Sequence, residues 1–447
     1  MMKQIWHKYK DNYIQLIKLG LPILIGQVGM IIVGFADTIM VGQYSTEALA
    51  SASFVNNVFN VANLACIGFT YGLTPLIGAL FTQKRYDTIG AMVRNGVFLN
   101  TMFALLLCAI MSIVYFNVHR MGQPTELLPL IRPYFLLFLV GIVPVAIFNA
   151  FAQWAYAINR TKMPMWIILI ANILNIICNY VLIYGKCGFP EMGLTGAGIS
   201  TLFARIFTMV AIAIVFFCFK DYRSYSAGYK QSRLSLRMLR QINRTSWPVA
   251  LQMALETGAF SVAAIMAGWL GKVPLASYQV MVTVGTLGFC IYYSLGSSVS
   301  VLVSNAAGLK DNRLIRQISF AGYHIMLTLA GISSVVFICF GEYLIKAFTG
   351  DQAVIATSMS LIVPLVLYQF CDATQINFAN ALRGTSNVLP MLWIAFVSYV
   401  IVGLPATYLL GFPCQLGIYG IYLSFSVSLS VAAALFLYFF MRTTRHQ

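Results

Sequence analysis

The chain has 447 residues, of which 60% are apolar and 9% are charged, and its formal net charge is +16. Globular domains carry about 25% charged residues, so this composition excludes a water-soluble protein. A membrane-spanning helix needs about 20 apolar residues, and twelve such helices fit both the length and the apolar fraction. The positive charge does not indicate a nucleic-acid partner, because the basic residues lie in short loops between apolar segments.

Twelve apolar runs follow one another along the chain. They cover residues 16–42, 47–80, 88–116, 127–157, 163–185, 193–219, 246–270, 275–308, 317–340, 352–382, 388–411 and 417–441. The runs are continuous and far longer than the roughly 10 residues of a barrel strand, which excludes a transmembrane β-barrel. We expect an all-α membrane protein with twelve transmembrane helices, several of them tilted or irregular.

The basic residues indicate how the chain is oriented. With both termini placed in the cytoplasm, 22 Lys and Arg residues lie on the inner side and five on the outer side, while Arg205 lies within a run. Cytoplasmic loops carry such an excess. The N-terminus is too polar for a cleavable signal peptide, so we expect the first span to be retained. The chain is predicted to lie in a bacterial inner membrane.

The second half of the chain repeats features of the first half. At an offset of 226 residues, Pro22 corresponds to Pro248, and at a slightly shorter offset the segment GLTGAGIS at 193–200 recurs as GIYGIYLS at 417–424. A repeat with an even number of spans keeps its membrane orientation. We therefore expect two pseudo-symmetric six-helix lobes. They cover residues 1–219 and 246–447, and a basic cytoplasmic linker at 220–245 joins them.

Duplicated bundles are typical of secondary transporters, whose site lies between the repeats. The sequence has no GxxxxGK[ST] phosphate-binding loop, so we do not expect ATP to be the energy source. Nine cysteines and four histidines form neither a CxxC pair nor a cluster, so no metal centre or cofactor is expected. These features favour an ion-coupled carrier over an enzyme; a channel or membrane scaffold is the weaker alternative.

Three carboxylates lie inside apolar runs, namely Asp37, Glu256 and Asp372. A charge at bilayer depth costs at least about 2.5 kcal/mol, so an acid kept there is a functional candidate. Such a group can exchange protons, or it can hold a hard cation such as Na⁺ beside neutral oxygens. Tyr368 lies four residues before Asp372 and shares its helical face. The alternative is a structural carboxylate that hydroxyl groups or Arg205 satisfy.

Polar residues at helical spacing accompany these acids. Asn175 and Asn179 are four residues apart, and with Thr201 in the next run they can join Asp37 around a cation or a proton. Asparagines in spans more often hydrogen-bond neighbouring helices. A polar stripe in the second run either lines a lumen or packs against other helices; it consists of Ser53, Asn56, Asn57 and Asn60.

Four regions of the sequence together resemble a known family of membrane proteins. They are LPILIGQVGMIIVGFADTIMVG in the first run, NILNIICNY with GLTGAGIST in the fifth and sixth, LQMALETGAF in the seventh, and FCDATQINFANALRGTSNVLP in the tenth. The chain resembles the multidrug and toxic compound extrusion (MATE) transporters, within a larger class that includes lipid-linked oligosaccharide flippases. The first-run Asp and the ALRG that follows an intramembrane Asp are the most specific signals.

The resemblance implies two lobes that open alternately to either side and export organic cations against Na⁺ or H⁺. It implies an N-lobe cation or proton site at Asp37, Asn175, Asn179 and Thr201. It further implies a C-lobe cation or substrate site at Glu256, Tyr368 and Asp372, with Na⁺ binding at Asp37, Glu256 or Asp372, and a helix bend at Pro22. Family members often carry Asp at the position of Asn179, and some carry an acid at that of Phe260, so each site here lacks one potential charge.

The expected partners follow from this likeness. We expect small organic cations as cargo, membrane lipids as surroundings, no nucleic acid, and a monomer. The alternative function is a flippase for a lipid-linked saccharide. A flippase would need a large cationic lumen for phosphate groups, whereas Arg205 is the one basic residue clearly inside a run.

Overall fold

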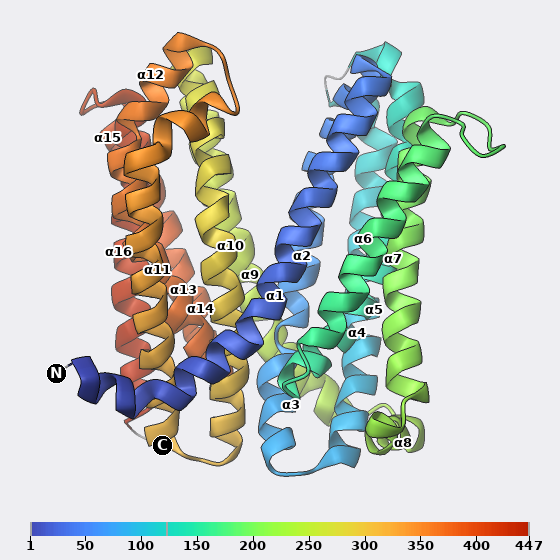
Figure 1. Ribbon diagram of the computed structural model, residues 1–447, viewed down its shortest axis with the longest axis vertical. Helices are drawn as coiled ribbons and strands as arrows, with labels where there is room; N and C mark the ends of the chain where they lie inside the picture. The colour runs from blue at the N-terminus through green and yellow to red at the C-terminus, as the bar shows by residue number, and fades with distance from the viewer. Residues whose placement is uncertain (1, 122–123, 446–447) are drawn as a thin grey trace. The chain divides into compact units, whose positions relative to one another are not determined.

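The computed structural model describes the backbone of residues 2–121 and 124–445, and side chains from residue 9 onward (Figure 1). No strand occurs in these ranges, and eleven of their helices are long and apolar enough to cross a membrane. A twelfth span results if the bent pair α12 (Gln352–Ser360) and α13 (Ile362–Gly384) is counted as one. The predicted all-α membrane fold is confirmed. The terminal residues 1 and 446–447, predicted to be cytoplasmic, lie outside the described residues.

The chain divides into two compact units, which we call the N-lobe (Ile25–Ala250) and the C-lobe (Met1–Leu24 with Leu251–Gln447). The long helices α1 (Met2–Tyr44) and α9 (Leu236–Trp269) therefore contribute residues to both units. This division differs from the predicted lobes 1–219 and 246–447, because the start of α1 packs with the C-lobe and the linker belongs to the N-lobe.

The remaining N-lobe helices are α2 (Thr46–Thr70), α3 (Leu73–Thr82), α4 (Tyr86–Asn117), α5 (Leu128–Ala157), α6 (Lys162–Ile183), α7 (Gly193–Cys218) and α8 (Arg223–Gln231), with short 3₁₀ turns at Val118–Arg120, Thr125–Leu127 and Lys220–Tyr222. Their shared core is aromatic. Trp154 is fully buried with its ring centroid 4.7 Å from that of Phe216, and Phe59 packs edge-on to Phe135 at 4.7 Å.

The remaining C-lobe helices are α10 (Lys272–Gly308), α11 (Asn312–Lys346), α14 (Leu389–Ala395), α15 (Leu404–Gly411) and α16 (Gly417–Thr443), with a π-helix, η4 (Phe396–Gly403), between α14 and α15. Pro405, in the first turn of α15, explains the π-helix, because proline removes a backbone N–H and its ring crowds the preceding turn. The bend of 47° between α12 and α13 comes just before Pro364.

The predicted run 47–80 is broken into α2 and α3 at Gly72. A Cβ at Gly72 would lie 2.6 Å from the Cα of Ser246, so only glycine permits this approach of α9. The Thr245 hydroxyl donates to the Gly72 carbonyl at 3.0 Å. The break is therefore stable inside the lobe, because the Thr245 hydroxyl satisfies the Gly72 carbonyl, which has lost its partner in the interrupted helix.

The linker 220–245 is folded onto the N-lobe. A Cβ at Gly90 of α4 would lie 2.1 Å from the Tyr225 carbonyl, so α8 crosses α4 with their backbones in contact. Arg94 donates to the Tyr229 carbonyl at 3.3 Å, at the C-terminal end of α8, where a cation complements the helix dipole. The polar composition of residues 220–245 predicted a connecting segment. In the structure this segment contains the helix α8, which packs on α4.

Candidate functional site

In the N-lobe, α1 and α6 bring Asp37 together with two asparagines. The Asn179 amide donates to the Asp37 carboxylate and, at 3.2 Å, to the Asn175 side-chain oxygen. Asn175 and Asn179 are 2% and 0% exposed, and Asp37 is partly buried. The four-residue spacing puts both amides on the face of α6 that meets α1. Three of the four residues predicted for this site therefore form one connected group.

Thr201, the fourth residue of the predicted N-lobe site, is not part of this group. Its hydroxyl donates to the Ala197 carbonyl of its own helix at 3.0 Å, and none of the hydrogen bonds found among the described side chains joins it to Asp37. Its hydroxyl oxygen still has lone pairs that can accept, so a part for Thr201 in the site stays a prediction.

Arg205, for which the sequence indicated no definite role, lies inside the N-lobe. Its guanidinium stands 4.6 Å above the centre of the Phe138 ring, and a Cβ at Gly141 would lie 2.6 Å from its Nη1. It is near enough to Asp37 and Tyr134 to interact with them electrostatically, although no direct ion pair with Asp37 forms within the described residues. The signal available in the sequence was that Arg205 lies four residues after Thr201 and therefore on the same helical face.

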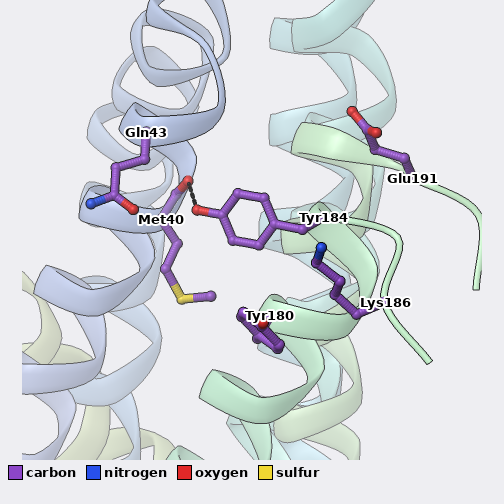
Figure 2. A pocket seen from close by; sticks show the side chains of 6 residues that line it. All are labelled: Met40, Gln43, Tyr180, Tyr184, Lys186 and Glu191. Atoms are coloured by element: carbon purple, nitrogen blue, oxygen red, sulfur yellow. Dashed lines mark hydrogen bonds between the residues drawn. The ribbon is translucent and has the colours of Figure 1, made fainter.

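An open pocket of about 580 Å³ lies about one helical turn from Asp37 and Asn179, and α1, the end of α6 and the loop that follows α6 line it. Its lining comprises two aromatic rings, a thioether, an amide and two opposite charges: Tyr180, Tyr184, Met40, Gln43, Lys186 and Glu191. Figure 2 shows the Tyr184 ring extending toward α1, where its hydroxyl donates to the Met40 carbonyl at 2.9 Å. The pocket is wide open, so an occupant would rest on these side chains and would not be enclosed by them.

Sequence reasoning did not predict this pocket. The signal that could have found it is adjacency, because Met40 is one turn beyond Asp37 and Tyr180 directly follows Asn179. Aromatic faces attract organic cations, and a methionine adapts to ligands of different shape. The pocket therefore suits an amphipathic ligand; among its lining residues Glu191, whose carboxylate interacts with the Tyr44 hydroxyl, is the acid, and Lys186 is the base.

The polar stripe of α2 is exposed rather than packed. The structure leaves its four members on the surface of the N-lobe: Ser53, Asn56, Asn57 and Asn60. Polar groups on a spanning helix are tolerated where they face a water-filled cavity. The stripe is therefore not packed inside the N-lobe, and a lumen lined by it stays a prediction.

In the C-lobe, α9 and α13 bring two carboxylates together. Gln252 donates to the Glu256 carboxylate at 3.0 Å, and the side chains of Tyr399 and Gln375 approach the same group. Asp372 is 5% exposed and near enough to Glu256 for the two acids to interact electrostatically. Two neighbouring carboxylates repel each other when both are ionised, so a proton or a cation stabilises the pair.

Tyr368, the third residue predicted for the C-lobe site, packs beside this pair. Its hydroxyl lies against Gly285, where a Cβ would come within 2.5 Å, and its ring centroid is 6.0 Å from that of Tyr422. A buried network that the sequence did not indicate begins at the next residue, Gln369. Its side-chain oxygen accepts from Tyr292 at 2.7 Å and from Ser333 at 2.6 Å.

A cavity of about 50 Å³ adjoins Glu256. Its polar lining includes Gln375, whose buried Oε1 has no hydrogen-bond partner within the described part of the chain. Arg383 also lines it and donates to Asn380 and, at 3.3 Å, to Ser300. A cavity of this size has room for an ion with a water molecule but not for a drug-sized compound.

Two further residues bear on the predicted sites. α1 is helical on both sides of Pro22, and the division between the compact units falls just after it, between Leu24 and Ile25. A bend at Pro22 stays a prediction.

Phe260 stacks on Phe425 with ring centroids 4.4 Å apart, so its position is part of the apolar core of the C-lobe.

A known protein family matches a segment in each half of the chain. The MatE family model matches residues 22–181 and 248–409, one segment in each half of the chain. The chain belongs to the MatE family. This MatE protein is thus a multi-pass membrane transporter and not an enzyme, and the resemblance noted in its sequence is confirmed.

Sequence relatives of this MatE protein cover nearly its whole length. The multidrug resistance protein NorM of Vibrio cholerae is 28% identical over 96% of this chain and 94% of the relative. A probable NorM of Oceanobacillus iheyensis is 27% identical over 95% of both chains.

Solved structures share the MatE fold. A variant of the Vibrio cholerae MATE transporter VcmN aligns with a TM-score of 0.88 at 16% identity, covering 99% of both chains. A MOP superfamily transporter from Pyrococcus furiosus aligns with a TM-score of 0.87 at 17% identity, covering 99% of this chain and 98% of that one. At these identities the likeness concerns the fold alone.

Proposed function

We propose that this MatE transporter exports amphipathic organic cations from the cell by alternating access, in exchange for Na⁺ or H⁺. In this proposal it acts as a monomer in a bacterial inner membrane with both termini in the cytoplasm. The relatives named as multidrug resistance proteins support the cargo class. The observation that carries the proposal is the presence of an open pocket with aromatic side chains in one lobe and an ion-sized cavity beside Glu256 in the other.

The N-lobe residues account for cargo binding. Tyr180, Tyr184 and Met40 provide apolar and aromatic surface for the body of an amphipathic compound, and Glu191 provides a carboxylate for its cationic group. Asp37 lies one turn away, held by the Asn179 amide. A cation that moves along α1 and α6 therefore meets two acids in succession.

The C-lobe residues account for ion coupling. Glu256 and Asp372 are stabilised together by a bound Na⁺ or a proton, while the unpaired Gln375 oxygen adds a neutral ligand of the type that hard cations prefer. An ion shifts a conformational equilibrium only if its affinity differs between the two conformations. We propose that the ion binds more tightly to the outward-open state, so that its inward gradient resets the carrier after cargo release.

The test uses the purified transporter in proteoliposomes loaded with a fluorescent organic cation. A Na⁺ gradient and a proton gradient are imposed separately. We expect one of them to drive export above the rate measured without a gradient. Export under neither gradient would overturn the ion-coupled mechanism, and transport of a lipid-linked saccharide in place of the cation would support the flippase.

A further inference from the structure

A second large pocket lies in the C-lobe, away from both candidate sites. It has a volume of about 680 Å³ and is found where α11 begins and α16 ends, with Tyr9 of α1 as one wall. Both α11 and α16 are long and apolar enough to span a membrane. The ends of spanning helices lie at the level of the lipid headgroups. The pocket is therefore at the depth where lipid phosphates are found.

The lining of this pocket is strongly basic. It contains three arginines, Arg313, Arg316 and Arg445, and no acidic side chain. In the part of the chain that the structure describes, none of the three is within ion-pair distance of a carboxylate. The acid that precedes α11, Asp311, uses its carboxylate to accept the backbone N–H of Leu314 at 2.9 Å. Within the described residues, three guanidinium groups thus share one pocket in which no ion pair with a carboxylate neutralises them.

The arginines are arranged for binding rather than only for solubility. Arg316 is partly buried, and its Nε donates to the Thr444 hydroxyl at 3.0 Å, which fixes the direction of its guanidinium fork. Guanidinium forks bind phosphate oxygens in a bidentate manner. Apolar side chains, Phe320 and Met441, complete the lining and can accept the glycerol end of an acyl chain.

We propose that this pocket binds the phosphate headgroup of an anionic phospholipid. A free phosphate anion would satisfy the same guanidinium groups. The lipid is favoured because the pocket is at the ends of two spans and combines a cationic lining with apolar side chains. Basic pockets between helix ends on the cytoplasmic side of membrane proteins bind such headgroups, and the positive-inside distribution assigns this end of the C-lobe to that side.

The bound headgroup would also contact the start of α1. Tyr9, which lines the pocket, has its ring 5.3 Å from that of His324, and the Tyr13 hydroxyl is 2.9 Å from His324 Nδ1. These contacts attach the segment of α1 before Pro22 to the C-lobe. Lipid binding is therefore expected to slow hydrogen exchange of the backbone amides around Tyr13.

The experiment measures lipid binding by native mass spectrometry on the full chain in detergent. The probes are phosphatidylglycerol, phosphatidylcholine and sodium phosphate alone. We expect phosphatidylglycerol to bind at least tenfold more tightly than phosphatidylcholine. One surface cation contributes about 1 kcal/mol, or roughly fivefold in affinity. R445Q should therefore bind phosphatidylglycerol about fivefold more weakly, and the variant R313Q/R316Q/R445Q at least tenfold more weakly.

The matched control is R442Q, because Arg442 is exposed on the same last turns of α16 but is not part of the pocket lining. It should keep its affinity within twofold. R445Q alters an exposed residue at the end of a helix, so it tests the proposal even if the triple variant does not fold. Unchanged binding in R445Q, an equal loss in R442Q, or inorganic phosphate binding as tightly as phosphatidylglycerol would each overturn the lipid site.

Discussion

The two lobes carry corresponding segments of the sequence repeat but offer different chemistry. The N-lobe holds one intramembrane acid, Asp37, bonded to an amide, and a pocket of about 580 Å³ one turn away. The C-lobe holds two neighbouring acids, Glu256 and Asp372, and Glu256 lines a cavity of about 50 Å³. The first site has room for an organic molecule, and the second has room for an ion. The difference favours a division of labour between cargo and coupling ion.

The two lobes also differ in how they balance charge. In the N-lobe, the guanidinium of Arg205 stacks on Phe138 and interacts with a single acid. In the C-lobe, Arg383 is buried in the same cavity as Glu256 but directs its donors to Asn380 and Ser300. The two C-lobe acids also lie close enough to interact with each other, and a bound proton or cation relieves the repulsion between two ionised carboxylates.

The largest effect is expected from removing both C-lobe acids. The double variant E256Q/D372N should reduce gradient-driven dye export from vesicles by at least about 100-fold, since it removes both carboxylates proposed to hold the coupling ion and about 1.4 kcal/mol of lost ion binding corresponds to each factor of ten. The control is E342Q, which removes an exposed acid paired with Lys346 and should transport normally. Full export by the double variant would show that the C-lobe does not couple the ion.

A smaller loss is expected from the N-lobe acid. D37N should lower export about tenfold while the coupling ion still binds in the C-lobe, because the cargo loses one of the two N-lobe acids, Asp37 and Glu191, proposed to attract it. Ion affinity, measured by the ion concentration that gives half-maximal export, should stay within twofold. If D37N changed that ion concentration as strongly as it changed the export rate, the proposed separation of cargo and ion sites would be wrong.

The pocket side chains should affect cargo affinity and not coupling. Y184A removes a ring and its hydrogen bond to Met40, so the KM for an aromatic cation should rise about threefold to tenfold with kcat unchanged. Y438A alters an exposed tyrosine of α16 that is not part of this pocket, and serves as the control. A fall in kcat at constant KM would place Tyr184 in the conformational change instead of cargo binding.

The smallest effect is expected at Gln375. Q375L removes the unpaired oxygen beside Glu256 while it keeps the volume of the side chain, so half-maximal export should need about threefold more coupling ion. The exposed residue Gln352, at the start of α12, provides the control Q352L. Equal behaviour of the two variants would remove Gln375 from the ion site.

Much of the candidate site could be predicted because buried charge is costly. Asp37, Glu256 and Asp372 were identified from their positions inside apolar runs, and the spacing of Asn175 and Asn179 predicted a shared face. The structure brings these groups together within each lobe. The pocket lined by Tyr180 and its neighbours was not predicted, because tyrosine and methionine are common in apolar helices and carry no charge penalty that would mark them.

The amino-acid sequence by itself determined that the chain is helical and spans a membrane, because lipid offers no partners for backbone N–H and C=O groups and a helix satisfies them locally. It also identified the acidic side chains whose position inside apolar runs is costly enough to indicate a function. Only the tertiary structure decided the break at Gly72, the docking of α8 on α4, and the sizes of the two cavities. These features depend on backbone approach and side-chain packing between segments far apart in the chain, which local periodicity does not encode.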